Sequence, residues 1–96
     1  MAAYAVGNYN VKDSDKWAEY RSKVPATLAP YNGELVFRGH PSEVLAGSHR
    51  HAGVVILRFA DMAALSGWFR SPAYQALIPL RDAGAQVDLV AYEADH

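Results

Sequence analysis

The sequence predicts an α+β domain in which helices cover one face of an antiparallel sheet. Residues 54–59, Val-Val-Ile-Leu-Arg-Phe, form a nearly continuous apolar run that is typical of a strand. Residues 62–69 follow as an amphipathic helix, and Ser71-Pro72 then marks another helix start, with a serine cap and proline at the first helical position. A weaker strand and helix precede these near the N-terminus. The 96 residues have room for one domain, spanning residues 1–96.

The N-terminal part predicts a strand followed by a long helix. Residues 3–10 form the strand, and Asp13 or Ser14 caps the helix. The core-facing side chains of this helix recur at three-to-four spacing, at Trp17, Tyr20, Val24 and Leu28. Pro25 lacks a backbone donor and predicts a kink or a restart. Gly33 is expected to end the element with a positive φ.

The rest of the chain predicts more strands and a pair of helices. The strands are at residues 34–38, 43–45 (a short edge strand), 54–59 and 86–93, and the helices at 62–69 and 72–83. Pro79 is expected to kink the second of these helices, and Gly84 to end it. The resulting order is the split βαβ arrangement of a ferredoxin-like fold, with both helical crossovers on one face of the antiparallel sheet.

The strands carry apolar side chains on both faces. In the strand at residues 54–59, Val54 and Ile56 lie on one side, and Val55, Leu57 and Phe59 lie on the other. Helices are expected on one face only, so the other face needs a second cover. We therefore expect a homodimer that packs sheet to sheet, since a chain of this length also gains burial by association.

Composition excludes several classes of function. The formal net charge is −1, and Lys and Arg are scattered, so neither nucleic acid nor an anionic membrane surface is an expected partner. The chain has no cysteine, which excludes disulfides, thiolate nucleophiles and cysteine metal sites. We find no signal peptide at the N-terminus and no run near the roughly 18 apolar residues of a membrane span. A soluble cytoplasmic protein is expected.

Several motifs together resemble a known family. They are Tyr20, Gly33, Arg38-Gly39, Val44-Leu45, Gly47, residues 54–59, Ser71-Pro72-Ala73-Tyr74-Gln75 and Arg81. With them the chain resembles the bacterial proteins grouped as domain of unknown function thirteen-thirty, within the dimeric α+β barrel superfamily. The resemblance implies a ferredoxin-like dimer. Neighbours in that superfamily include cofactor-independent monooxygenases, small-molecule isomerases and haem-handling proteins.

Three positions depart from the pattern of this family. Asn32 stands where the family usually has a second glycine, Ala46 where it has an acidic residue, and Arg58 where it tends to have Glu. The last two changes remove carboxylates from the region where a general base is expected. A reaction that depends on those acids is therefore not carried over to this chain.

Polar residues in phase with apolar strand positions are the first site candidates. Asn8 is in phase with Val6, Arg38 with Val36, and Arg58 with Val54 and Ile56, which predicts inward-facing side chains. A buried arginine needs an anionic or carbonyl partner, and a ligand can supply it. The alternative is a structural ion pair, for example of Arg58 with Asp88 or Glu93.

The four histidines are a second group of site candidates. Three histidines, His40, His49 and His51, lie near one predicted loop, and His96 is the fourth. They suggest a metal site, but no Asp or Glu stands at ligand spacing in the loop, so we favour His40 or His51 as a single base and expect no metal or cofactor.

Aromatic residues from the helices supply an apolar wall. Tyr20, Trp68 and Tyr74 are expected to line a small-molecule pocket, because buried tyrosine hydroxyls need polar partners, whereas Trp17 and Phe69 are expected to be ordinary core. Helical aromatic residues are often nothing more than core, and that alternative applies to all five.

These candidates predict binding of a small apolar molecule that carries a carbonyl, phenol or carboxylate. If the protein is an enzyme, His40 is the base, Arg38 stabilises an enolate-like oxyanion and Tyr20 is a hydrogen-bond donor or weak acid, in cofactor-independent proton transfer, isomerisation or oxygenation. The expected ligand-binding residues are Asn8, His51, Arg58, Trp68 and Tyr74. The alternatives are a non-catalytic ligand-binding or assembly module and, less favoured, haem or metal handling by the histidines.

Overall fold

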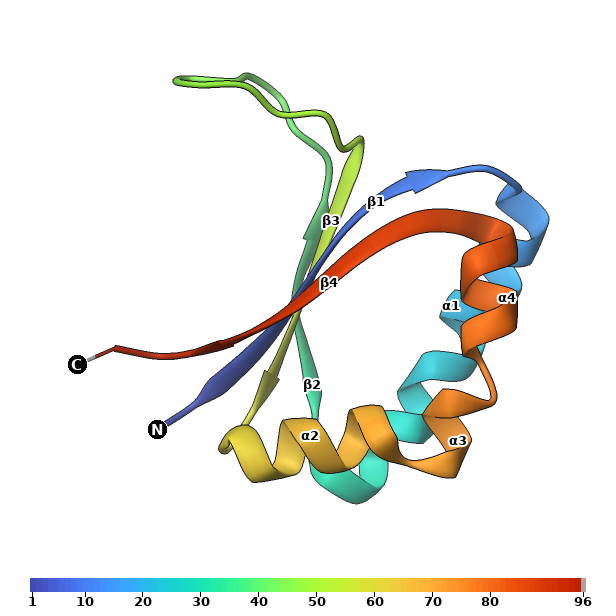
Figure 1. The fold of residues 1–96 in the computed structure, drawn as a ribbon, viewed down its shortest axis with the longest axis vertical. Helices are drawn as coiled ribbons and strands as arrows, with labels where there is room; N and C mark the ends of the chain where they lie inside the picture. Colours follow the sequence, from blue (N-terminus) through green and yellow to red (C-terminus); the bar gives the residue numbers. More distant parts are fainter. Residues whose placement is uncertain (96) are drawn as a thin grey trace.

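A computed structural model describes residues 1–95 and contains one four-stranded antiparallel sheet in the order β2-β3-β1-β4. The elements are β1 (Ala3–Val11), α1 (Ser14–Leu28), a 3-10 turn η1 (Ala29–Tyr31), β2 (Glu34–Gly39), β3 (Gly53–Phe59), α2 (Met62–Arg70), α3 (Pro72–Gln75), α4 (Ile78–Gly84) and β4 (Ala85–Glu93). All the helices lie on one side of the sheet (Figure 1). The predicted ferredoxin-like α+β arrangement is confirmed.

The covered face of the sheet holds the core. Along β1 the buried residues alternate with partly exposed ones, beginning with buried Ala3. The largest fully buried side chains are Trp68 of α2, Tyr74 of α3 and Phe59 of β3. Ring centroids of Trp68 and Tyr74 lie 4.3 Å apart, and those of Trp68 and Phe59 lie 5.4 Å apart, so these helices meet the sheet through an aromatic cluster.

Helix α1 begins after the predicted cap, Asp13. One carboxylate oxygen of Asp13 accepts hydrogen bonds from the backbone N–H groups of Asp15 and Lys16, both at 3.1 Å. The helix runs through Pro25 as one element, so the predicted restart is wrong, whereas the predicted kink stays a prediction. The N–H of Ala29 still bonds to the carbonyl of Pro25, and the turn that follows the proline therefore keeps its hydrogen bond.

The turn after α1 uses asparagine, not glycine, for its left-handed residue. Asn32 has φ 53° and ψ 32°, whereas Gly33 does not have a positive φ, contrary to prediction. This conformation also explains why a glycine is expected at position 32 in the family. Gly33 is needed for space, because a Cβ there would lie 2.7 Å from the Phe59 ring and 2.8 Å from Leu28.

Two other predicted elements differ from the structure. Residues 43–45 are not a strand but part of an exposed loop, residues 40–52, that projects beyond the sheet (Figure 1). Leu45 is 87% exposed there, since its short apolar run has no strand beside it to pair with. The predicted helix at 72–83 is divided in two. Pro79 lacks an N–H and lies in the first turn of α4, where none is needed.

The opposite face of the sheet has no helical cover. We call it the open face; it includes Phe37, Val90 and Tyr92, which are 50%, 46% and 53% exposed. Val54 and Ile56 of β3 also belong to it, so the predicted two-sided apolar character of this strand is confirmed. Within residues 1–95, no helix is long and apolar enough to cross a membrane.

Candidate functional site

A small cavity lies between the covered face of the sheet and the helices. Its volume is about 40 Å³, and its lining residues are Gly7, Trp17, Tyr20, Arg21, Val24, Arg38, Val55, Leu57, Trp68, Tyr74, Val87 and Leu89. Four of the predicted site residues are among them: Tyr20, Arg38, Trp68 and Tyr74. The structure therefore brings residues from α1, β2, α2 and α3 around one space.

Two tyrosine hydroxyls and an arginine form a chain of hydrogen bonds beside this cavity. The hydroxyl oxygens of Tyr20 and Tyr74 are 2.9 Å apart, and either can be the donor. Arg81 of α4 donates from Nη1 to the Tyr74 hydroxyl at 3.2 Å and from Nε to Asp82 at 3.0 Å. Arg81 therefore pairs with Asp82 of its own helix and with the Tyr74 hydroxyl.

Burial decides the protonation state of Tyr20. Removal from water raises the pKa of Tyr20 well above its ordinary value, and the neighbouring Tyr74 raises it further. Arg81 and Arg38 oppose this shift but do not cancel it. Tyr20 is therefore a neutral phenol near pH 7, able to donate a hydrogen bond to a ligand but unsuited to act as a base.

Hydrogen bonds at helix ends hold the aromatic wall in place. The indole N–H of Trp68 donates to Thr27 Oγ1 at 3.0 Å. Ser71 Oγ donates to the carbonyl of Trp68 at 2.7 Å and accepts from the backbone N–H of Tyr74 at 3.2 Å. Ser71 is thus a cap, as the sequence indicates, and it joins α2 to α3 so that both aromatic rings face the cavity.

A bulge in β2 directs Arg38 to this cavity. Val36 has no partner in the ladder with β3, whereas Leu35 and Phe37 on either side of it have. The extra residue shifts the alternation of side chains by one, so Arg38 lies opposite Val55 on the covered face. The prediction that Arg38 is in phase with Val36 is therefore wrong, and the bulge is the physical reason.

Arg38 also borders a larger hollow, which we call the outer hollow. Its volume is about 410 Å³, and Tyr9, Val11 and His40 line it together with Arg38 and nearby backbone. Burial lowers the pKa of Arg38, and the positive charge of Arg21 lowers it further. His40, the predicted base, lines the outer hollow and does not line the cavity that holds Tyr20.

Two of the predicted ligand-binding residues lie on the other face of the sheet. Asn8 is paired in register with Val54 and Asp88, so its side chain belongs to the open face. Arg58 also lies there and donates to Glu34 at 3.1 Å. The predicted partners of Arg58, Asp88 and Glu93, are wrong, because the register places Glu34 of β2 directly opposite. Neither Asn8 nor Arg58 reaches the cavity.

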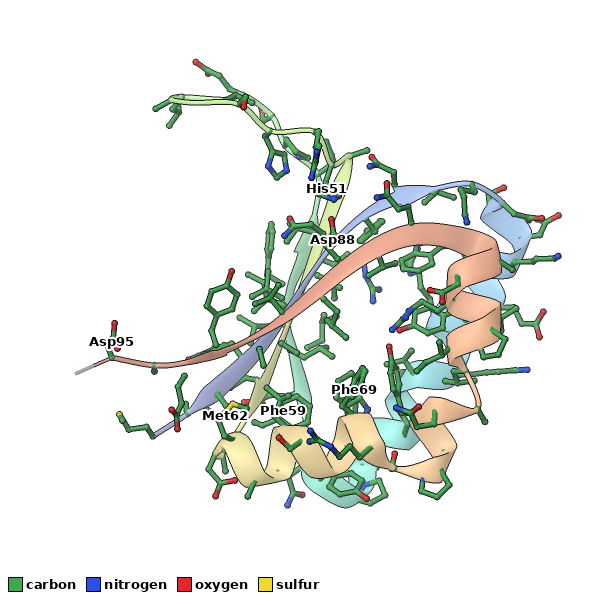
Figure 2. The ribbon with its side chains drawn as sticks, viewed as in Figure 1. His51, Phe59, Met62, Phe69, Asp88 and Asp95 are labelled. Atoms are coloured by element: carbon green, nitrogen blue, oxygen red, sulfur yellow. The ribbon has the colours of Figure 1, made fainter. Side chains whose placement is uncertain are left out.

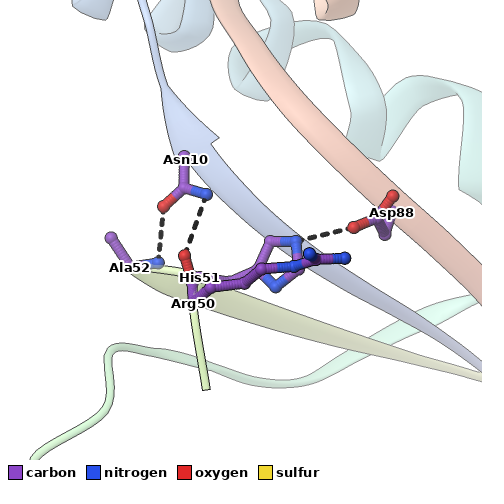
Figure 3. Close-up of polar contacts among 5 residues, drawn as sticks. All are labelled: Asn10, Arg50, His51, Ala52 and Asp88. Carbon is purple, nitrogen blue, oxygen red and sulfur yellow. Dashed lines mark hydrogen bonds and ion pairs between the residues drawn. The ribbon is translucent and has the colours of Figure 1, made fainter. Parts of the chain in front are cut away.

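His51 is held on the open face as well. Its Nε2 lies 2.6 Å from a carboxylate oxygen of Asp88, and Figure 3 shows this contact reaching from the end of the loop to β4. Beside it, the Asn10 side chain donates to the carbonyl of Arg50 at 3.2 Å and accepts from the N–H of Ala52 at 2.8 Å. This arrangement fixes the loop to the sheet.

The histidines do not form a metal centre in the part of the chain that the structure describes. No group of three or more His, Cys, Asp or Glu side chains is placed to hold an ion among residues 1–95. The rings of His49 and His51 are 5.7 Å apart, and His40 lies apart from them at the outer hollow. His96 lies outside the described residues.

A further hollow of about 270 Å³ lies between α2 and β4. It shares Trp68 and Leu89 with the cavity and is also lined by Met62, Phe69 and Arg70. Figure 2 shows Met62 and Phe69 on α2, with Phe59 of β3 nearby. Ser66 and Arg70 contribute polar groups to this lining, which is otherwise apolar.

Arg21 lines the cavity but is not among the residues predicted from the sequence. The residue follows Tyr20 and lies four positions after Trp17, so helical spacing puts it on the same side of α1. That spacing was the available signal. It is easily overlooked because an arginine on an amphipathic helix is usually assigned to the solvated side.

The comparisons with known proteins identify the family. The family described as domain of unknown function (DUF1330) matches residues 2–94. The chain belongs to this family. Among curated proteins, no match to this DUF1330 chain was found.

Solved structures share the fold of this DUF1330 protein. A protein of unknown function from Rhodopseudomonas palustris has a TM-score of 0.80 at 16% identity, covering 99% of this chain and 83% of its own. A dimeric ferredoxin-like protein of unknown function from Jannaschia has a TM-score of 0.77 at 17% identity, covering 98% and 100%. SnoaB, a cofactor-independent oxygenase from Streptomyces nogalater, has a TM-score of 0.71 at 14% identity, covering 99% and 94%. At these identities the likeness establishes a ferredoxin-like fold and leaves function to the site.

Proposed function

We propose that this protein binds a small apolar molecule through a carbonyl, phenol or carboxylate head group. The observation that carries the proposal is that Arg38 and the hydroxyl-bearing Tyr20 line one cavity. A neutral phenol and a guanidinium are both hydrogen-bond donors, so together they favour an oxygen acceptor between them. The apolar rings of Trp68 and Tyr74 close the cavity around such a group.

The volumes of the cavity and of the outer hollow favour a ligand whose head group lies in the cavity and whose body lies in the outer hollow. The cavity of about 40 Å³ is too small for an aromatic ring, since a cavity of about 150 Å³ is known to hold benzene. It has room for a head group of a few atoms. The outer hollow of about 410 Å³ falls within the usual range for ligand sites and shares Arg38 with the cavity. The body of the ligand would lie there, against Tyr9 and Val11.

The same residues would suit a cofactor-independent reaction of a carbon acid. Arg38 and Tyr20 would stabilise an enolate-like oxyanion at the head group, and His40 would remove a proton from the part of the ligand in the outer hollow. The Streptomyces relative is a cofactor-independent oxygenase, which makes proton transfer, isomerisation or oxygenation the reactions to test first. Binding without turnover is the alternative, and it uses the same site.

The open face supports a homodimer as the assembly of this protein. Its exposed side chains, Phe37, Val90 and Tyr92, extend the apolar surface of β3, and the Jannaschia relative is a dimeric ferredoxin-like protein. Packing two such faces together would complete a dimeric α+β barrel and bury these side chains. The charged groups at the margin, Arg58 and Asp88, already have partners in their own chain.

A titration with acetophenone, a small apolar ketone, tests the binding proposal. In two-dimensional NMR of the labelled protein, we expect saturable shifts at the backbone amides of Gly7 and Val55. Gly7→Ala is the blocking variant, because its new Cβ would lie 3.1 Å from a Val55 methyl and fill part of the cavity. Gly67→Ala, whose Cβ would meet Tyr31 of η1 instead, is the matched control.

The outcomes of this titration are distinct. Binding that Gly7→Ala weakens and Gly67→Ala preserves supports the proposed site. Shifts confined to Met62, Phe69 and Arg70 would move the site to the hollow between α2 and β4, against the proposal. A complete lack of saturable shifts would contradict the proposed function.

A further inference from the structure

Two arginines at the cavity have no acidic partner. Arg21 of α1 and Arg38 of β2 both line it, and in the described part of the chain neither makes an ion pair or a side-chain hydrogen bond. Arg58 and Arg81 differ, because they donate to Glu34 and Asp82. Both residues are exposed as a whole, and this pair of cations at the cavity has no counter-charge from the described part of the chain.

The two guanidinium groups are close enough to affect each other. The positive charge of Arg21 lowers the pKa of Arg38, second only to the effect of burial. The groups that act in the opposite direction are the phenols of Tyr9 and Tyr20, and no carboxylate contributes. Two like charges in this position repel, and an anion placed between them would relieve that repulsion.

We propose that Arg21 and Arg38 form a carboxylate-binding subsite at the cavity, so that the ligand is a small apolar acid. This inference rests on the proposed function and narrows the head group of the ligand from a carbonyl, phenol or carboxylate to a carboxylate alone. A carboxylate is planar and has two oxygens, which matches two guanidinium donors, and Tyr20 adds a third donor from inside the cavity. A neutral carbonyl would leave one of the two positive charges without a partner.

A matched pair of probes tests the inference. Benzoate and benzamide have nearly the same shape but differ in charge, and both are titrated by NMR against the wild type, Arg21→Gln, Arg38→Gln and Arg50→Gln. Arg50 is the control, because its side chain lines a separate surface hollow with His49 and His51. We expect benzoate to bind at least about tenfold more tightly than benzamide, in keeping with a charge-assisted hydrogen bond.

The variants then separate the possible results. Arg21→Gln and Arg38→Gln should each weaken benzoate about tenfold and benzamide less than about twofold, whereas Arg50→Gln should change neither. If benzamide binds as tightly as benzoate, the carboxylate inference is wrong and the proposed function stands. If Arg50→Gln weakens benzoate as much as the cavity variants do, net charge explains the effect and the subsite is wrong. If neither probe binds, the inference and the proposed function both fail.

Discussion

On the open face of the sheet, Arg58 donates to Glu34 at 3.1 Å and His51 lies 2.6 Å from Asp88, whereas Arg38 on the covered face has no acidic partner in the described part of the chain. The apolar groups show the reverse. The covered face buries its aromatic rings almost completely, with Trp68 at 1% exposure, but Tyr92 on the open face is 53% exposed. The open face therefore leaves apolar side chains without a packing partner, whereas the covered face leaves charged side chains without an ion-pair partner.

This difference suggests a separate role for each face. A surface with paired charges and exposed apolar side chains gains most from another apolar surface, as in association of two copies. A region with buried apolar walls and unpaired cations gains most from a small anion. The comparison can be tested one face at a time, because substitutions on one face should leave the other unchanged.

The largest expected effect comes from removing a ring on the covered face. Trp68→Ala should lower the free energy of unfolding by about 3–5 kcal/mol, because Trp68 is fully buried and its indole bonds to Thr27. Tyr92→Ala, on the open face, should cost less than about 1 kcal/mol in a monomeric background. Urea unfolding measures both. Equal losses would contradict the assignment of the core to the covered face alone.

The next effect concerns assembly through the open face. Ile56→Arg would place a charge at the centre of a sheet-to-sheet interface and should weaken the dimer by several kcal/mol, about 100-fold or more. Analytical ultracentrifugation of the variant should give the mass of one chain. Ala63→Arg, an exposed position on α2, is the control and should remain dimeric. A dimer that tolerates Ile56→Arg would use another surface.

The third effect is a change in alkaline stability that depends on Tyr20. The pKa of Tyr20 is raised in the folded protein above its unfolded value of about 10, so the folded state holds this proton more tightly. Its contribution is complete below about pH 10 and declines as the pH rises further, by up to about 1.4 kcal/mol per pH unit. Tyr20→Phe should make the decline shallower.

Urea unfolding in the range of about pH 9 to 11 measures this slope. Tyr92→Phe is the control, since Tyr92 is 53% exposed and should leave the slope unchanged. Identical slopes for the wild type and Tyr20→Phe would show that Tyr20 is not buried as described. At neutral pH, Tyr20→Phe should cost about 1 kcal/mol from its lost hydrogen bond to Tyr74.

The smallest effect is expected from deleting Val36. Removal of this extra residue restores a regular ladder between β2 and β3 and leaves Arg38 opposite Val55, so benzoate affinity should stay within about twofold of the wild type. If Arg38 were instead in simple alternation with Val36, the deletion would turn it to the other face. A loss of benzoate binding, with the fold retained, would therefore contradict the bulge assignment.

The fold was predictable from the sequence because its signals are local. Caps such as Asp13 and Ser71, and the apolar run at residues 54–59, define most of the elements. The predictions were wrong where pairing between strands decides the outcome. Residues 43–45 have strand-like composition but no neighbouring strand, and strict alternation cannot reveal that Val36 is an extra residue.

The site was predictable only in part, for the same reason. Helical spacing correctly brought Tyr20, Trp68 and Tyr74 to one cavity, because the stripe of a helix depends on that helix alone. Asn8 and Arg58 are predicted ligand-binding residues, yet they lie on the open face, since only the register of the sheet decides which side they share.

The most direct test of the separation between the faces is the benzoate affinity of the Ile56→Arg variant, measured by NMR once its monomeric mass is established. We predict a monomer whose affinity for benzoate is within about twofold of the wild type, because the cavity at Arg38 is formed by one chain. A monomer that no longer binds benzoate would contradict the account, since it would show that the ligand site needs the open face or a second copy.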